Sequence, residues 1–431
     1  MDPLTLALIG FLAMMALIAL HVPIGIAMAL VGITGFAQIV GWGPALSLMA
    51  SEPAAAMSNL DLAVIPLFML MGSLAAAGGL ATDVYDMANA MIGHRRGGLA
   101  TTTVLASAGF GAICGSGVAT TATFGRVALP EMLARGYQPG LAAGSIAAGG
   151  TLGIIVPPSA MMILYAVLTE QSVLDLFTAA VVPAILAVGF YFVAVQYIVM
   201  RAPASAPVSP RMPIRERLRA IARGWGVFAL AVVVMGGIYS GVFTVNEAAA
   251  IGVVIAFVFA LVRGRLTRQT ALHVLAEASS ATAMVYIMVF GATIFSYFIA
   301  VSGGAAFLVD SIAHLPVPPV MVIFGLLLLY IFLGAFFDEV AAMVVTLPFV
   351  IPIVTGLGYD LVWWGIINVV VIGIGMLSPP LGINVMLLNS MHRDVSLSTI
   401  YRGVTPFMIA DLLRLILLVL VPALTLWLPS L

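Results

Sequence analysis

The stretch GIIVPPSA at residues 153–160, together with GMLSPPLG at residues 375–382, decides how this chain folds. Each stretch places a pair of prolines inside an apolar run. A Pro-Pro pair removes two backbone N–H donors and disfavours helical geometry at the residue before it, so a helix that arrives there must break. The two stretches lie 222 residues apart, and the same offset brings Ser116 onto Asp338. We therefore predict two halves of related architecture, each with one broken helix.

Composition predicts that both halves are embedded in lipid. The chain has 431 residues, of which 63% are hydrophobic and 8% charged, whereas roughly a quarter are charged in an ordinary soluble domain. Ten segments are long enough to cross about 30 Å of hydrocarbon. They span residues 4–20, 24–41, 62–91, 141–168, 175–200, 222–243, 246–262, 279–301, 359–390 and 403–428.

Two further apolar stretches, 99–134 and 318–356, are interrupted near their middles. The first contains Gly-Ser-Gly at 115–117, and the second contains Gly334 and the pair Asp338-Glu339. Non-helical backbone at membrane depth is tolerated only inside protein or beside a water-filled cavity. These stretches are therefore predicted to be re-entrant hairpins.

The distribution of arginine predicts the topology. Residues 201–223 carry six Arg and one Glu, which marks a cytoplasmic linker by the positive-inside rule. The loops predicted to lie opposite, at 42–61, 169–175, 244–245 and 302–317, contain no Arg. Five crossings and one hairpin then precede the linker, and five crossings and one hairpin follow it. An odd number of crossings inserts the second half upside down, with both termini in the periplasm, as in inverted-repeat secondary transporters.

The predicted fold class is thus an all-α polytopic membrane protein of two inverted repeats, each with five transmembrane helices and one re-entrant hairpin. The first repeat covers residues 1–200 and has its hairpin, 99–134, on the cytoplasmic side. The linker covers residues 201–221. The second repeat covers residues 222–431 and has its hairpin, 318–356, on the periplasmic side.

Composition also excludes several chemistries. All sixteen basic residues are Arg and none is Lys, which removes the P-loop lysine and the Schiff-base lysines. Cys114 is the single cysteine, so an internal disulfide or a Cys-based metal site is excluded. Neither G-x-S-x-G nor H-E-x-x-H is present, and no basic block could hold a nucleic acid. We expect neither an ATP-driven pump nor an enzyme.

The breaks and the hairpin tips offer oxygen ligands for a small cation. Broken helices free carbonyl oxygens, glycines allow close approach, and Ser, Thr and Asp side chains add further hard oxygens. A half-helix N-terminus nearby can hold an anionic group of a substrate. The candidate cation ligands are Gly115, Ser116, Thr120, Thr151 and Pro157 in the first half, and Gly334, Asp338, Ser378, Pro379, Gly382 and Asn384 in the second.

Each candidate also has a structural interpretation. Gly-Ser-Gly and Pro-Pro can be packing notches and kinks, although their recurrence at equivalent positions favours a site. An intramembrane carboxylate costs roughly 2.5–3.5 kcal/mol on the insertion scale, so Asp338 needs a cation partner or a role as a helix N-cap. Arg126 can attract a substrate carboxylate or extend to the cytoplasmic surface, and Ser159 is the second substrate candidate. Glu339 is left unassigned.

Several motifs resemble the large membrane subunit of tripartite ATP-independent periplasmic (TRAP) transporters. They are GSGVATTATFG (115–125), ALPEMLARGY (128–137), GIIVPPSAMMILYAVLTEQSV (153–173), GVFTVNEAAAIG (241–252), GAFFDEVAAMVVTLPFVIPIV (334–354) and GIGMLSPPLGINV (373–385). The resemblance implies an elevator-type secondary transporter of the bacterial inner membrane. It also implies uptake of an organic acid, such as a C4-dicarboxylate or a sialic acid, coupled to two or more sodium ions.

The resemblance further implies two protein partners, a small four-helix membrane subunit and a periplasmic substrate-binding protein. The chain is too short to include the small subunit as a fusion. Arg126 departs from the family, which carries a small residue at that place. The stretches 43–60 and 264–281, again offset by about 222 residues, would be paired interfacial arms that join the scaffold to the moving domain.

Three alternatives remain. A single-component sodium/anion symporter of the wider ion-transporter superfamily would differ only in needing no binding protein. An intramembrane protease or acyltransferase would need a nucleophile and a base at membrane depth, and the motifs for these are missing. A passive channel is disfavoured because broken inverted helices form an occluded site and not a continuous pore.

Overall fold

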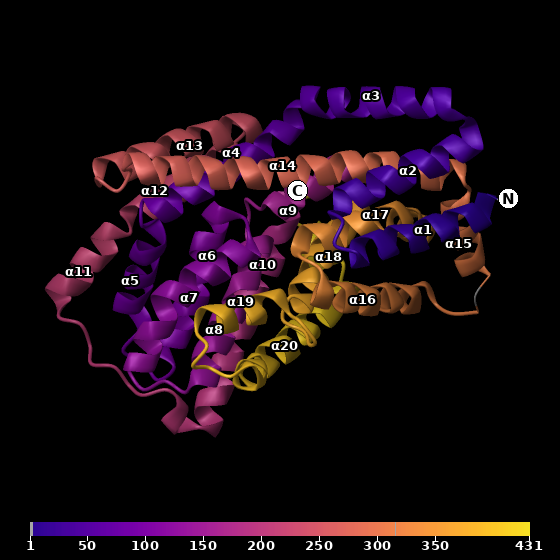
Figure 1. The fold of residues 1–431 in the computed structure, drawn as a ribbon. Coiled ribbons are helices and arrows are strands. Elements are labelled where there is room, and N and C mark those ends of the chain that lie inside the picture. Colours follow the sequence, from indigo (N-terminus) through magenta and orange to yellow (C-terminus); the bar gives the residue numbers. More distant parts are fainter. Residues whose placement is uncertain (1–2, 315) are drawn as a thin grey trace.

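The computed structural model describes residues 3–314 and 316–431, and the regular elements in those residues are all helices (Figure 1). The predicted all-α membrane fold is confirmed. Eight helical segments of the described chain are long and apolar enough to cross a bilayer, or nine if the pair α8–α9, bent by 41°, counts as one broken span. The predicted periplasmic position of the N-terminus concerns residues 1 and 2, which lie outside the described residues.

The helices follow one another in two similar series. The first half contains α1 (Pro3–Ala19), α2 (Ile24–Val40), α3 (Trp42–Ser58), α4 (Leu60–Ala77), α5 (Leu80–Ile92), α6 (Gly98–Cys114), α7 (Gly117–Ala134), α8 (Pro139–Ile155), α9 (Ala160–Thr169) and α10 (Val173–Arg201). The linker contains the 3-10 helix η1 (Pro203–Ser205) and α11 (Ile214–Arg223). The second half contains α12 (Trp225–Tyr239), α13 (Val245–Val262), α14 (Arg268–Val301), α15 (Gly304–Ala313), α16 (Pro319–Phe336), α17 (Glu339–Gly356), α18 (Leu361–Gly375), α19 (Ile383–Met391), α20 (Leu397–Leu420) and α21 (Ala423–Leu426).

The helices of the second series recur at nearly the offset that the sequence showed. Both ends of α7 and α17 lie 222 residues apart, and so do the first residues of α8 and α18. The Pro157–Pro158 and Pro379–Pro380 bonds, both cis, occupy equivalent breaks. The opposite orientation of the two halves across the membrane stays a prediction.

The two predicted arms differ. In the first half α3 ends before Asn59, whose side chain accepts a hydrogen bond from the Asp61 N–H (2.8 Å) and so starts α4 as a separate helix. The equivalent position is Ala281, a strong helix former, and there the arm, helical from Arg268, runs without a break into the next crossing as the 34-residue α14. The segment 62–91, expected to be one helix, is divided because Gly79 adopts a left-handed conformation (φ +80°) between α4 and α5.

Small residues let helices of the two halves pack closely. α2 packs along α14, and α13 packs along α4; α14 extends beside these helices across the upper part of Figure 1. A Cβ built on Gly291 would lie 2.0 Å from the Gly25 carbonyl oxygen. Such small-residue contacts let helix backbones approach one another where no hydrophobic effect drives their association.

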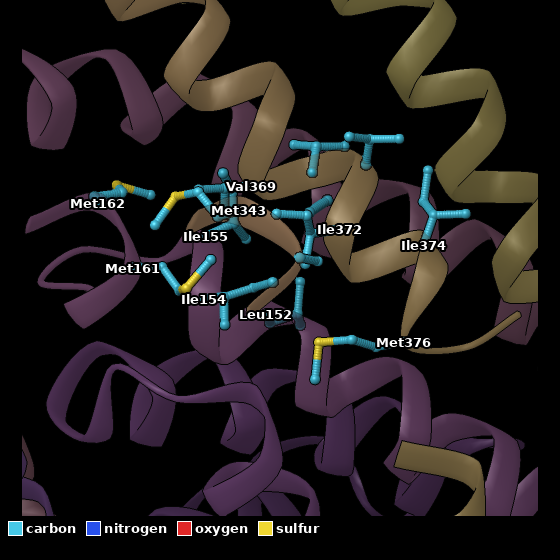
Figure 2. Close-up of a cluster of buried hydrophobic side chains, with 14 of the residues drawn as sticks. Leu152, Ile154, Ile155, Met161, Met162, Met343, Val369, Ile372, Ile374 and Met376 are labelled. Carbon is cyan, nitrogen blue, oxygen red and sulfur yellow. The ribbon is translucent and has the colours of Figure 1, made fainter. Parts of the chain in front are cut away.

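The two broken helices meet in an apolar cluster (Figure 2). Its side chains come from α8, α9, α17, α18 and the segment after α18, and they are almost completely buried. The labelled members are Leu152, Ile154, Ile155, Met161, Met162, Met343, Val369, Ile372, Ile374 and Met376. The cluster joins the two breaks on their apolar side, and polar groups gather at the neighbouring hairpin tips.

Candidate transport site

Helix caps shape the two hairpin tips. Gly115 (φ +65°) ends α6 in a left-handed conformation, and Ser116 starts α7 by accepting a hydrogen bond from the Ala119 N–H at 3.4 Å. Asp338 starts α17 in the same way, because its Oδ1 accepts from the Ala341 N–H at 2.8 Å. The predicted equivalence of Ser116 and Asp338 is thus seen in their shared N-cap role. The cap on Asp338 is formed by Oδ1, which is a single oxygen of the carboxylate.

Both stretches form antiparallel hairpins. At the open end of the first hairpin, the Tyr137 hydroxyl accepts from the Leu99 N–H at 3.1 Å. Nearer its tip, the rings of Phe110 and Phe124 lie edge to face at 5.9 Å. In the second hairpin, Thr346 of α17 hydrogen-bonds the Tyr330 hydroxyl of α16. Each contact joins a residue before the tip to one that follows the tip by a similar number of residues. Two antiparallel helices joined by a short turn give this pattern.

Each hairpin lies against the broken helix of its own half. A Cβ built on Gly111 would lie 2.6 Å from the Gly153 Cα, and one built on Gly334 would lie 3.0 Å from the Gly375 Cα. Gly115 abuts the first break, since its Cβ would lie 3.2 Å from the Pro158 carbonyl oxygen. In the second half, the Gly382 N–H donates to the Ala335 carbonyl at 3.2 Å. The predicted pairing of tip and break therefore holds in both halves.

Glu339 links the two hairpins across 223 residues. Its Oε1 accepts from the Ser116 hydroxyl at 2.9 Å, and its Oε2 accepts from the Gly117 N–H at 3.2 Å. The side chain is only 7% exposed. A carboxylate at the start of α17 thus occupies the N-terminus of α7, where free N–H groups and the helix dipole favour an anion. The sequence holds one signal for this contact, since the 222-residue offset places Glu339 on Gly117 of the other tip, but a contact between the two tips is not predicted from it.

Several predicted ligands already have protein partners. The Thr120 hydroxyl donates to the Ser116 carbonyl at 2.7 Å, and the Ser378 hydroxyl donates to the Ile374 carbonyl at 2.8 Å. Asn384 Nδ2 donates to the Ala147 carbonyl at 3.2 Å, which brings α19 against α8. The Asn384 Oδ1 and the Ser159 Oγ are buried and have no hydrogen-bond partner among the described residues. These two oxygens are available to a ligand.

The two breaks differ in their exposure. Pro157 and Pro158 are buried, whereas Pro379 and Pro380 are exposed. At the second break the Tyr401 hydroxyl lies 3.0 Å from the Pro380 carbonyl oxygen and 2.8 Å from the Leu381 carbonyl oxygen. The first break is therefore enclosed by protein, and the second exposes its prolines at the surface of this chain, whereas Ser378, Gly382 and Asn384 beside it are buried.

Thr151 belongs to a different polar group from the hairpin tips. Its hydroxyl lies 2.7 Å from the Tyr191 hydroxyl, which donates to Asp411. Asp411 in turn pairs with Arg414 at 2.8 Å, and both side chains are almost completely buried. This network joins α8, α10 and α20. The sequence places Asp411 and Arg414 three residues apart within the predicted crossing 403–428, which is the spacing of a helical ion pair. The pair is not among the predictions made from the sequence.

Arg126 is not brought to the tips. It is exposed on α7, ten residues beyond Ser116, which is roughly 15 Å along a helix. The neighbouring Gly125 carbonyl contacts the His392 ring at 3.0 Å, near the end of α19. Within residues 3–314 and 316–431, none of the ion pairs involves Arg126.

The site offers oxygen ligands of the kind that hard cations prefer. No group of three or more His, Cys, Asp or Glu side chains comes together in the described part of the chain. The tips and breaks present hydroxyl, amide, carboxylate and backbone carbonyl oxygens, which suit alkali and alkaline-earth ions better than transition metals.

Hairpins that meet broken helices in two related halves define a class of proteins, the secondary transporters, which bind their cargo near the membrane midplane. Solved transporter structures share the fold. The YdaH transporter of Alcanivorax borkumensis matches with a TM-score of 0.58 at 16% identity, over 89% of each chain. The MtrF efflux pump of Neisseria gonorrhoeae matches with a TM-score of 0.59 at 11% identity, over 90% of this chain and 85% of that one.

Sequence comparison is more specific. The family model for the DctM component of tripartite ATP-independent periplasmic transporters matches residues 11–424. The C4-dicarboxylate TRAP transporter large permease protein DctM of Pseudomonas aeruginosa is 35% identical over 402 residues, 93% of each chain. The chain therefore belongs to the DctM family of large TRAP permeases, and it is a transport component and not an enzyme. The expected family is confirmed.

Proposed function

We propose that this chain carries an organic acid across the bacterial inner membrane by sodium-coupled, elevator-type transport. The observation that carries the proposal is that each hairpin tip meets a broken helix, and that the Ser159 Oγ and the Asn384 Oδ1 there are buried without a hydrogen-bond partner among the described residues. The relatives support an organic acid as cargo: one is named for C4-dicarboxylates, and the sialic acid large permease SiaM of Vibrio cholerae is 29% identical over 387 residues.

The proposal includes two cation positions, which the geometry of the tips and breaks supports. The first lies between Gly115, Ser116 and the buried break at Pro157, with Ser159 beside it. The second lies between Asp338 and the break at 378–384. The Glu339 bridge couples the two tips, so occupation of one position would affect the other. At a membrane potential of about 150 mV each net positive charge that moves inward gains roughly 3.5 kcal/mol, enough for strong accumulation without ATP.

The proposal includes topology and partners. The two halves form inverted repeats, with residues 201–221 in the cytoplasm and both termini in the periplasm. TRAP large permeases work with a small membrane subunit and a periplasmic binding protein. We infer that this chain works with both kinds of partner, because it aligns over 93% of both lengths with a large permease protein of such a transporter.

The test is uptake by reconstituted vesicles that contain this chain, the small subunit and a loaded binding protein. Succinate and a sialic acid serve as labelled probes, each with the binding protein that holds it. Uptake should require an inward sodium gradient and should be lost when either partner is omitted. Uptake that persists without sodium would contradict the coupling. Saturable uptake by this chain alone would replace the tripartite system with a single-component symporter.

Asp338→Asn distinguishes a ligand from a cap in the same vesicles. An Asn can still cap α17, but it lacks the negative charge, so we expect the sodium concentration for half-maximal uptake to rise about tenfold. Ser116→Ala should have a smaller effect, because the backbone carbonyls at its tip remain. An unchanged sodium dependence in Asp338→Asn would show that Asp338 is only a cap.

A further inference from the structure

The helix α11 presents its apolar side chains away from the rest of the chain. Ile214, Leu218 and Ile221 follow one another at helical spacing, and they are 72%, 60% and 37% exposed. The helix packs on α5, and its half-buried residues are Arg217 and Ala220. No residue of α11 is buried. A helix on a water-exposed surface would show the opposite arrangement.

The exposed apolar stripe continues onto α12, a membrane-spanning helix. Beyond Ile221 it includes Trp225, Phe228 and Val232, which are 60%, 58% and 65% exposed. The six side chains alternate at spacings of four and three residues, so they lie on one side of the α11–α12 unit. The two helices together count as one span of the described chain, Ile214–Tyr239.

The length of α12 shows where this stripe meets the membrane. Its 15 residues rise about 22 Å, which is roughly 8 Å less than the hydrocarbon of a typical bilayer. About five residues of α11 are needed to cover the difference. The boundary between acyl chains and headgroups then falls near Leu218, with Ile221 just inside it and Trp225 about 10 Å deeper along the helix.

The charges around the stripe suit anionic headgroups. Arg215 and Arg217 flank the apolar face on its two sides, and Arg219 and Arg223 complete four guanidinium groups on this ten-residue helix. Glu216 is its single acidic residue. In the part of the chain that the structure describes, the four ion pairs involve other residues. Arg223 lies close enough to Asp86 of α5 to interact with it, so Arg215, Arg217 and Arg219 are the guanidinium groups of α11 that remain for lipid phosphates.

We propose that α11 is an anionic-lipid-binding helix, which inserts Ile214, Leu218 and Ile221 at the membrane surface and pairs its arginines with phospholipid phosphates. The chemistry resembles that of amphipathic interfacial helices, whose binding combines apolar burial with attraction to anionic lipids. Because α11 packs on α5, and α5 packs on the first arm of the first hairpin, the lipid contact would hold the linker against the helices that support the site.

Fluorescence at a single labelled cysteine tests the insertion. Leu218→Cys in a Cys114→Ser background carries an environment-sensitive NBD label, and the protein is placed in nanodiscs that contain 30% phosphatidylglycerol or phosphatidylcholine alone. Spin-labelled lipid with a shallow nitroxide should quench the label strongly in the anionic discs. The same label on Glu216→Cys, on the polar face, should be quenched little. Equal and weak quenching at both positions would overturn the insertion.

Titration of short-chain phosphatidylglycerol into the detergent-solubilised, labelled protein tests the charge. Each Arg near an anionic surface contributes about 1 kcal/mol, so Arg215→Gln with Arg219→Gln should weaken binding about 30-fold. Arg95→Gln with Arg96→Gln removes the same charge from an exposed loop and should leave binding unchanged. Equal affinity of the native helix for phosphatidylglycerol and phosphatidylcholine would overturn lipid recognition. So would an NBD label at Leu218→Cys that responds to added small subunit and not to either lipid.

Discussion

Glu339 shows how one carboxylate can organise a site built mostly from backbone. Its side chain is buried and reaches the N-terminus of α7 at the tip of the other hairpin. There it accepts hydrogen bonds from the Ser116 hydroxyl and the Gly117 N–H. Asp338, its neighbour, caps its own helix instead. Of these two adjacent carboxylates, Asp338 forms its hydrogen bond within its own hairpin and Glu339 forms its hydrogen bonds to the other hairpin.

Replacing Glu339 with Gln should separate the tips. The amide retains one acceptor oxygen, so Gly117 and Ser116 can no longer both donate to this side chain, and the charge that strengthens these hydrogen bonds, worth about 1.5–3 kcal/mol each, is lost. We expect a rise of about tenfold in the sodium concentration for half-maximal uptake, with a smaller change in the maximal rate. Glu216→Gln on the exposed linker helix is the matched control. If both variants show native sodium dependence, the bridge has no part in coupling.

The buried Asp411–Arg414 pair permits a prediction about stability. Removing one partner of a buried ion pair leaves an uncompensated charge and typically costs about 3–5 kcal/mol. Arg414→Met alone should therefore lower the thermal unfolding midpoint in detergent markedly. Arg414→Met combined with Asp411→Leu should recover most of the loss, since the charge is gone from both sides. A single variant as stable as the double variant would contradict a paired role.

At the scale of elements, glycine contacts set the distance between each hairpin and its broken helix. Gly111 of α6 faces Gly153 of α8, and Gly334 of α16 faces Gly375 of α18. The two contacts occupy nearly equivalent places in the two halves. A change in this distance would move the tip relative to the break, and with it the oxygens that surround the proposed cation.

Gly111→Ala should disturb the first hairpin, because the added methyl group would lie 2.6 Å from the Gly153 Cα. Overpacking of this kind costs typically 1–3 kcal/mol, so both thermal stability and sodium affinity should fall. Gly109→Ala is a control on the same helix, where the nearest atom would be 3.4 Å away, and it should be neutral or slightly stabilising. Equal behaviour of the two variants would show that the close contact is not limiting.

At the scale of the whole molecule, the linker joins two series of helices that pack into each other. Helices α2 and α13, from different halves, pack on α14 and α4 of the opposite half. The halves therefore do not form separate domains. Their proposed opposite orientation determines which face of the membrane each loop meets.

Cysteine labelling tests this orientation. In a Cys114→Ser background, Ala204→Cys and Asp310→Cys should react with a membrane-impermeant maleimide from opposite sides, the first from the cytoplasm and the second from the periplasm. Ala204 is exposed, whereas the adjacent Ser205 is buried and would label poorly on either side. Labelling of both cysteines from one side would contradict the inverted arrangement.

The sequence by itself determined the membrane environment, the two series of helices, the breaks at both Pro-Pro pairs and the N-cap that was one of the two roles expected for Asp338. These features depend on local chemistry, since proline, glycine and capping side chains act within a few residues of their own position. The difference between Asn59, a capping residue, and Ala281, a helix former, is equally local.

Only the tertiary structure decided which polar groups meet. The Glu339 bridge joins residues 223 positions apart, and the Tyr191–Asp411 hydrogen bond joins residues 220 positions apart. Such contacts depend on how whole helices pack, and no local pattern specifies that packing. Arg126 is a second example. The sequence shows that it lies on α7, but only the packing of α7 shows that this part of the helix is exposed and does not face the site.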